Sequence, residues 1–356
     1  MFGRNLIAVL LLAALFAFSV LAAASPTADA AEDGKGIYAP GFKSSMAGFI
    51  PPPGTYGSSY KLYYSGSASG AAAVGVALDQ LGPINARVNI QAEIELDAEL
   101  FIEVPIALWI TPHKIMGGNL GYGIFLPVGW QDASVDIDAL GTLTLGGRGP
   151  FGGITLARGA HFDIDDDTFN FGDPLLTALV GWHRGNWHWN VAGLLNVPIG
   201  AYDQNDLVNM GFNRWAFDAS ASATWLNAQK GHEASVAAGF TFNGENPDTN
   251  YRTGTEFHVE FALMQHFSKA FAAGLTGYHY KQVTGDSGAG ATLGNFKGQT
   301  TALGPNINLN FQLGRTPVST SLRWLHEFDV RNRLEGDLVV FSATFPLGGA
   351  RRGSSK

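Results

Sequence analysis

The chain has 356 residues, no cysteine and 15% charged residues, with a formal charge of -8. The absence of cysteine excludes a disulfide framework and a cysteine-ligated metal site, and mild acidity without a basic cluster argues against nucleic acid as a partner. The chain contains 46 glycines and 12% aromatic residues, and its mean hydropathy is +0.06. This composition is expected for a protein built of strands that each have one apolar and one polar face.

Residues 1–30 predict a signal peptide. Arg4 precedes an apolar run at residues 6–21, and small residues after it offer Ala22-Ala23-Ala24 and Ala28-Asp29-Ala30 as cleavage sites. A transmembrane anchor is the alternative, but the run is shorter than the roughly 20 residues of a membrane helix and lacks a basic flank. We therefore expect an exported chain from which this segment is cleaved.

Residues 31–54 are rich in glycine and proline, and two interpretations stay open. In the first, the segment folds into the lumen of a barrel as a hatch that carries an apolar patch. In the second, it is a disordered lead in the periplasm. The predicted hatch residues are Ile37, Tyr38, Phe42, Met46, Phe49 and Ile50.

The clearest strand pattern lies at residues 90–110, where every even position is apolar. A helix would spread these residues around its circumference, whereas a strand places them all on one face. The run is long for a soluble domain, so the expected host is a large barrel with an apolar outside and an aqueous inside. The odd positions of the same strand include Gln91, Glu93, Glu95, Asp97, Glu99 and Glu103.

The remaining sequence repeats the alternation in shorter strands, and the first of these is Thr55–Ser65. Short turns at 185–186, 227–231, 268–269 and 314–316 alternate with long connections at 163–174, 200–213, 244–253 and 284–299. Short turns on one side and long loops on the other are typical of outer-membrane barrels. We predict an all-β transmembrane antiparallel barrel over residues 55–348 with about fourteen strands, twelve being the alternative, and a C-terminal tail at residues 349–356.

Tryptophans lie at the ends of several of these strands. Trp215 and Trp225 enclose ten residues of alternation, and a tilted strand of that length rises about 25 Å, the height of the apolar band of a barrel. Two core aromatics of a β-sandwich are the alternative. The predicted aromatic girdle consists of Trp187, Trp215 and Trp225.

Charged residues on the polar faces of the C-terminal strands are the candidate lumen lining, because unpaired charges on a lipid face are costly. They either discriminate solutes or stiffen the wall as a ladder of salt bridges, and the two roles are compatible. The predicted lumen residues are Arg214, Asp218, His258, Glu260, His266, Arg323, Glu327, Asp329 and Arg331.

Clusters that suggest other chemistry are incomplete. The aspartates at 163 and 165–167 resemble a calcium loop, but Thr168 and Pro174 replace the glycine and glutamate that an EF-hand needs, which favours an exposed acidic loop. His183 and His188 flank a tight turn without a third marked metal ligand. We therefore expect no catalytic residue, no metal and no cofactor.

An ordered set of short motifs extends over nearly the whole mature chain. They are Ala39-Pro40-Gly41, Pro51-Pro52-Pro53-Gly54, Leu62-Tyr63-Tyr64-Ser65-Gly66, Lys114-Ile115-Met116-Gly117-Gly118, Phe171-Gly172-Asp173-Pro174, Gly181-Trp182-His183-Arg184-Gly185-Asn186-Trp187, Asn213-Arg214-Trp215, Gly277-Tyr278, Gly285-Asp286-Ser287-Gly288, Leu325-His326-Glu327-Phe328, Asn332-Arg333 and Glu335-Gly336. Through these motifs the chain resembles the phenol meta-pathway (MetA-pathway of phenol degradation) family of outer-membrane transporters. That resemblance implies a barrel that passes hydrophobic or aromatic compounds. A departure is the tail, where Phe345 is followed by eleven further residues instead of ending the chain.

The sequence thus predicts a non-enzymatic channel of the bacterial outer membrane for passive uptake of small hydrophobic compounds, aromatic ones foremost. The expected partners are outer-membrane lipid and lipopolysaccharide, the solute itself and the barrel-assembly machinery. A structural or adhesion barrel is the first alternative. The second is an outer-membrane lipid hydrolase, for which Ser220 and Ser222 lack a marked histidine neighbour.

Overall fold

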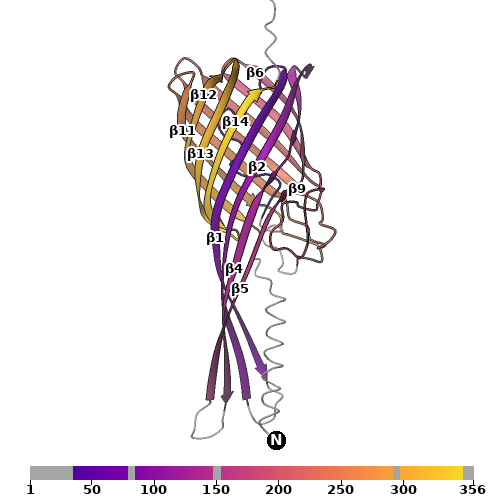
Figure 1. Ribbon diagram of the computed structural model, residues 1–356, viewed down its shortest axis with the longest axis vertical. Helices are drawn as coiled ribbons and strands as arrows, with labels where there is room; N and C mark the ends of the chain where they lie inside the picture. Colours follow the sequence, from indigo (N-terminus) through magenta and orange to yellow (C-terminus); the bar gives the residue numbers. More distant parts are fainter. Residues whose placement is uncertain (1–34, 79–84, 147–153, 292–296, 348–356) are drawn as a thin grey trace, which may run out of the picture. The chain divides into compact units, whose positions relative to one another are not determined.

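A computed structural model describes residues 35–78, 85–146, 154–291 and 297–347 (Figure 1). The predicted signal peptide at 1–30 and the predicted tail at 349–356 lie outside these residues. The described residues form fourteen β-strands, as the alternation predicts. They are β1 (Gly54–Leu78), β2 (Asn85–Ile115), β3 (Gly118–Phe125), β4 (Val128–Gly146), β5 (Ile154–Phe171), β6 (Leu175–Arg184), β7 (Trp187–Asn196), β8 (Ala216–Asn227), β9 (His232–Asn243), β10 (Glu256–His266), β11 (Phe271–Gln282), β12 (Gln299–Leu313), β13 (Thr316–Arg331) and β14 (Glu335–Pro346).

Twelve of the strands close a barrel. The hydrogen-bonded order runs from β1 through β14 and down to β6, then to β3 and β2, and β2 pairs back to β1. The remaining two strands, β4 and β5, follow β2 in the sheet. The chain therefore has the predicted fourteen strands, and the barrel wall has the twelve that stood as the alternative.

The described residues fall into two compact units. One consists of residues 68–78, 85–96, 134–146 and 154–165, which belong to the long strands β1, β2, β4 and β5. The other consists of residues 35–67, 97–133, 166–291 and 297–347 and contains the closed barrel. In the described residues, no helix is long and apolar enough to cross a membrane.

Most predicted connections are confirmed. β6 and β7 are joined by a two-residue turn, β12 and β13 by another, and the segments at 197–215, 244–255 and 283–298 are long. The predicted loop at 163–174 is wrong, because β5 continues to Phe171. Asp163 and Asp165 alternate with Phe162 and Ile164, and this stretch extends as part of the last strand in the order β2–β4–β5.

The long alternating strand is confirmed as β2, but its apolar face is turned the other way. Val104 and Ile110, on the even face, are buried, whereas Phe101 and Trp109, on the odd face, are exposed. Within the barrel unit the apolar face of β2 therefore points inward. The expectation of a uniformly aqueous inside is wrong here, because this wall faces other apolar side chains in the interior.

The outside of the barrel is apolar on most strands. Trp215 directly precedes β8 and Trp225 lies near its other end, both at positions of outward parity, and Trp225 pairs in register with Trp187 on β7. That the three form an interfacial girdle stays a prediction. Outward apolar bands of this kind are typical of barrels that span a bilayer; the exposed members on β6 to β12 include Leu176, Val191, Phe217, Val236, Phe240, Phe261, Leu263, Leu275, Leu303, Ile307, Leu309 and Phe311.

Candidate functional site

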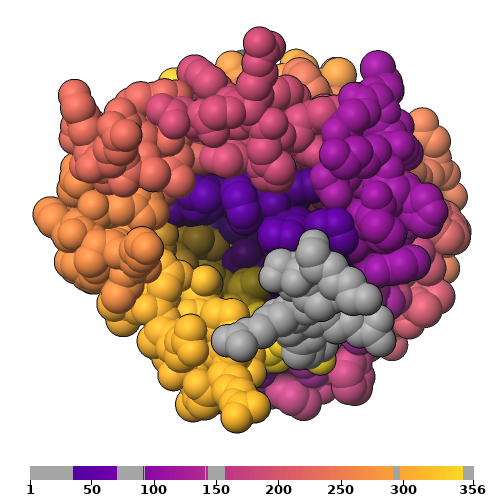
Figure 2. Space-filling model, turned by 90° about the horizontal axis from the view of Figure 1, so that it is seen from above, coloured from indigo at the N-terminus to yellow at the C-terminus, as the bar shows by residue number. Residues whose placement is uncertain are grey.

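Residues 35–53, here called the N-terminal segment, lie inside the barrel. Figure 2 shows the indigo atoms of the N-terminal part within the ring of strands. At the start of the segment, the Lys35 ammonium donates to Gln131 Oε1 and to the Asn209 carbonyl at 2.7 Å each. Of the predicted hatch residues, Ile37, Tyr38 and Ile50 are buried, Phe42 and Met46 are half-buried, and Phe49 is 39% exposed.

The middle of the N-terminal segment is tied to one wall by side-chain hydrogen bonds. Lys43 Nζ donates to Ser220 Oγ at 3.0 Å and to Ser222 Oγ at 3.2 Å on β8. Ser44 Oγ bonds Thr276 Oγ1 on β11 at 2.9 Å and accepts from Asn306 Nδ2 on β12 at 2.8 Å. Burial lowers the pKa of Lys43. Successive side chains of a strand point to opposite faces. These small polar residues occupy the positions whose side chains point into the barrel.

A buried polar cluster holds Tyr38. Its hydroxyl donates to Glu260 on β10, and its ring stacks on His258 with centroids 3.5 Å apart. His258 Nε2 lies 2.8 Å from Asp218 Oδ2, which also accepts from Thr241. Burial, and next the charge of Glu260, raise the pKa of Tyr38 well above its ordinary value, so the phenol stays protonated and remains a donor.

The end of the segment is tied through backbone groups. Met46 N donates to Glu233 Oε1 at 2.6 Å, and Gly48 N donates to Thr224 Oγ1 at 2.9 Å. Asn190 Nδ2 donates to the Ala47 carbonyl at 2.9 Å. Gly48 lies so close to the wall that an added Cβ would stand 2.4 Å from His188 O and 2.5 Å from Thr224 N.

We expect Gly48→Ala to lift residues 46–50 off the wall. A methyl group at that distance from backbone atoms cannot be accommodated, and overpacking of this kind costs about 1–3 kcal/mol. Limited proteolysis of the folded protein should cut this part of the segment faster than in the parent. Gly159→Ala, whose added Cβ would meet nothing closer than 3.8 Å, is the matched control; equal cleavage of both variants would contradict the expectation.

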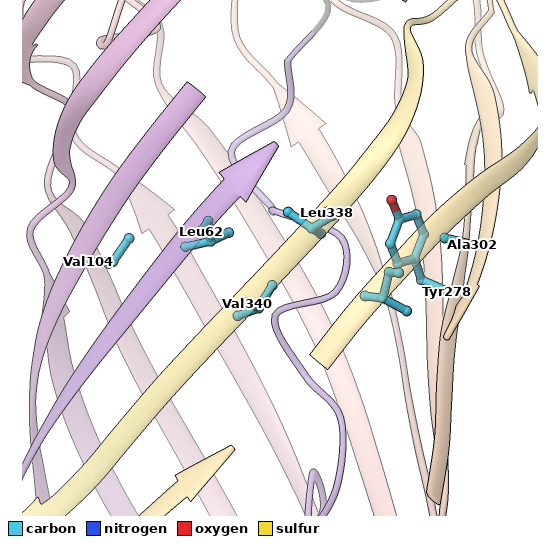
Figure 3. Close-up of a cluster of buried hydrophobic side chains, with 7 residues drawn as sticks. Leu62, Val104, Tyr278, Ala302, Leu338 and Val340 are labelled. Carbon is cyan, nitrogen blue, oxygen red and sulfur yellow. The ribbon is translucent and has the colours of Figure 1, made fainter. Parts of the chain in front are cut away.

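Another part of the barrel interior is apolar. Figure 3 shows buried side chains of β1, β2, β11, β12 and β14 directed into the same space. Phe42 of the N-terminal segment stacks on Tyr60 with centroids 4.2 Å apart and lies 5.6 Å from Phe125. The apolar wall consists of Leu62, Val104, Tyr278, Ala302, Leu325, Leu338 and Val340, with Tyr60, Tyr64, Ile102, Ile106 and Phe125 packed against it.

Six of the predicted lumen residues are buried in the barrel, and one is half-buried. His266, the half-buried one, lies 2.6 Å from Glu233. Asp329 and Arg331 are different: they are exposed at the end of β13 and pair with each other at 3.5 Å. The buried ones are Arg214, Asp218, His258, Glu260, Arg323 and Glu327.

Several of these charges contact the N-terminal segment. Arg323 donates to the Phe42 carbonyl at 2.9 Å and Arg214 to the Lys35 carbonyl at 3.3 Å. Glu327 instead accepts from the hydroxyls of Tyr64 and Tyr278, at 2.9 and 2.6 Å. These contacts of the polar lining are with the N-terminal segment and with tyrosines of neighbouring strands, so both predicted roles, solute discrimination and a ladder of salt bridges, stay predictions.

Sequence reasoning missed residues that matter here. Lys43, Ser44 and Ser45 carry no motif, and Glu233, which binds Ser45 and Met46, sits next to a turn. The position of Glu233 on the inward face of β9 could have identified it as a lumen residue, but the neighbouring sequence does not indicate which segment it binds. The serines predicted for the hydrolase alternative, Ser220 and Ser222, both accept from Lys43.

Comparisons with known proteins agree with the barrel. Residues 70–343 match the model of a family described as "Putative MetA-pathway of phenol degradation". The chain is similar to an outer membrane channel from Pseudomonas putida F1, with 14% identity over 86% of this chain and 98% of that chain, at a TM-score of 0.55.

Two further solved structures are more distant. They are OccK1 (OpdK) from Pseudomonas aeruginosa, with 8% identity over 82% of this chain and 98% of that chain at a TM-score of 0.31, and OccAB1 from Acinetobacter baumannii, with 7% identity over 82% and 96% at 0.32. A comparison with curated proteins found no match.

Proposed function

Because this chain belongs to the MetA-pathway of phenol degradation family and folds as an outer-membrane β-barrel, we propose that it is a passive outer-membrane channel for small hydrophobic compounds, aromatic ones foremost. Export with cleavage of residues 1–30, insertion by the barrel-assembly machinery and contact with lipopolysaccharide belong to the same proposal. No covalent chemistry or cofactor enters it.

The observation that carries the proposal is the cluster of apolar side chains on one part of the barrel interior. A barrel that passes only ions and polar solutes has a polar lining, whereas here β1, β2 and β14 contribute an apolar wall of aliphatic and aromatic side chains. An apolar solute loses little by moving along such a surface, and offset stacking on Tyr60 or Phe125 adds about 0.5–1.5 kcal/mol per aromatic pair.

The N-terminal segment has the role of a plug in this proposal. It lies across the lumen, bound to the polar wall through Lys43, Ser44 and Ser45 and to the apolar wall through Phe42. Twelve strands enclose more space than their own side chains fill, since about eight strands already suffice for a side-chain-filled interior. A plug limits the leak of water and ions while apolar solutes pass beside it.

The test compares cells with and without the protein for uptake of radiolabelled phenol, toluene and a long-chain fatty acid, together with single-channel conductance of the purified barrel. We expect faster entry of an apolar solute with low ion conductance. Large, steady conductance without solute preference would instead identify a general porin. No change in either measurement would overturn the channel and leave a structural or adhesion barrel.

A further inference from the structure

Two histidines meet at the hairpin turn between β6 and β7, on the inward face of the wall. His183 and His188 are directly opposite in the register of the two strands. Their Nδ1 atoms are 2.7 Å apart. Gly181 and Asn190 lie two positions away from these histidines and therefore on the same face of the wall. Gly181 lies against Ile50 and Asn190 bonds the Ala47 carbonyl, and since Ile50 and Ala47 belong to the N-terminal segment, this face points inward.

The pair is held in place from both sides of the wall. On the inner side, Phe49 packs against both imidazoles, with ring centroids 5.2 and 5.3 Å away. On the outer side, Trp182 and Trp189 stack at 6.2 Å, and Trp182 Nε1 donates to the Met116 carbonyl at 3.0 Å. Such support reduces the conformational freedom that the two imidazoles would lose on binding a shared ligand.

Two neutral imidazoles at this distance share one N–H···N hydrogen bond, so one ring presents a free Nδ1 lone pair to the other. If the donor ring carries its hydrogen on Nε2 instead, both Nδ1 lone pairs are available. His183 is exposed and His188 half-buried, so solvent can exchange that proton and an ion can reach the pair. Imidazole nitrogen is a good ligand for copper, nickel and zinc.

From this geometry we propose that His183 and His188 form a two-imidazole binding site for Cu²⁺, and more weakly for Ni²⁺, next to Phe49. With metal–nitrogen bonds of about 2.0 Å, two cis ligands of a tetragonal ion are about 2.8 Å apart, whereas two ligands of a tetrahedral ion are about 3.3 Å apart. The observed 2.7 Å between the Nδ1 atoms is close to the tetragonal spacing, and binding requires each ring to turn so that its Nδ1 lone pair points at the shared ion and no longer at the other ring.

The remaining coordination positions belong to water or to a small external ligand. In the part of the chain that the structure describes, no group of three or more histidines, cysteines, aspartates or glutamates is placed to hold a metal. The site is therefore open, and it binds less tightly than a closed structural site. Bound metal fixes both rings against Phe49 and so restrains the end of the N-terminal segment.

The test uses the full-length protein in detergent, stripped with a chelator and titrated with Cu²⁺. Electron paramagnetic resonance at less than one equivalent of copper should show a tetragonal spectrum with nitrogen couplings from two imidazoles. His183→Ala and His188→Gln should each weaken that binding at least tenfold, and Ni²⁺ should compete better than Zn²⁺. His161→Ala, which removes an exposed histidine paired with Asp138, is the matched control and should keep the spectrum.

Folding of each variant is checked by the shift in gel mobility between unheated and boiled samples, so that loss of binding is not confused with loss of the barrel. The same spectrum and affinity in parent, His183→Ala and His188→Gln would overturn the site and place the copper elsewhere on the chain. Zn²⁺ binding more tightly than Ni²⁺ would overturn the tetragonal geometry.

Discussion

Removing residues 36–48 is expected to raise the single-channel conductance of the barrel by roughly threefold or more, because the twelve-stranded lumen is then left without the chain that occupies it. Selectivity for apolar over polar solutes should fall at the same time, since water and ions fill the freed space. Planar-bilayer recordings of parent and deletion variant measure both effects. Unchanged conductance in a folded deletion variant would contradict the plug.

Because a large deletion can disturb assembly, a second variant keeps the full chain and weakens attachments of the N-terminal segment. Tyr38→Phe removes the hydroxyl that donates to Glu260, and Glu233→Gln weakens the acceptor of Ser45 and Met46. This double variant should show intermittent openings of the larger conductance. It changes one strand residue, Glu233 on β9, and deletes none, so the strand register is kept and its barrel provides the folded reference that the deletion lacks.

A reversible lock separates movement of the segment from damage to the wall. The γ-oxygens of Ser44 and Thr276 are 2.9 Å apart, and the chain has no cysteine of its own. Ser44→Cys with Thr276→Cys therefore places two thiols within reach of a disulfide. Added to the weakened variant, the oxidised pair should restore the low conductance, and reduction should release it again. Large openings that persist in the oxidised form would show that the segment is not the plug.

The alternation of the strands could be predicted because it is local. Burial on one face and exposure on the other impose a period of two on β2, β7, β8, β10 and β12 whatever the strands pair with. The number of strands in the wall could not be derived this way. β4 and β5 alternate like the others, and only the pairing of β2 with β1 excludes them from the closed ring.

The sequence pattern also could not predict which face of a strand points to the lipid and which points to the interior. The even face of β2 is apolar from residue 90 to 110, and an apolar face can turn to lipid or to an apolar interior with the same local sequence. What decides between them is a set of long-range contacts, in which Val104 shares a cluster with Leu62 and Leu338. Strand parity could have hinted at the choice, since Trp109 on the odd face is a typical interfacial residue.

The candidate site was predicted in part for a similar reason. Charges such as Glu260 and Arg323 could be assigned to the inside because a lipid face would not tolerate them. Their partners in the N-terminal segment are more than 200 residues away, as with Tyr38 and Glu260. No periodicity encodes such pairs, so the segment's contacts could be placed only by the folded structure.

Making the apolar wall polar should reduce uptake of apolar solutes without opening the channel to ions. Val104 is the suitable position, since it is 8% exposed and lies on the inward face of β2. A series of Val104→Ala, Val104→Thr and Val104→Asn removes volume first, then adds a hydroxyl, then an amide. If the wall is the solute path, initial uptake rates should fall in that order, with roughly a tenfold loss for asparagine, because an unpaired polar group at an apolar surface costs about 1–3 kcal/mol.

The same series distinguishes a solute path from packing alone. If Val104 serves only packing, the loss of uptake should follow the volume removed, so alanine, whose cavity costs about 1–3 kcal/mol of stability, should lower uptake more than threonine, which is close to valine in volume. Conductance recorded in parallel should stay low in all three variants, since the N-terminal segment is untouched. Uptake that falls with volume and not with polarity would therefore assign the apolar wall to holding the plug, and the solute would have to pass along the polar wall beside Lys43 and Ser44.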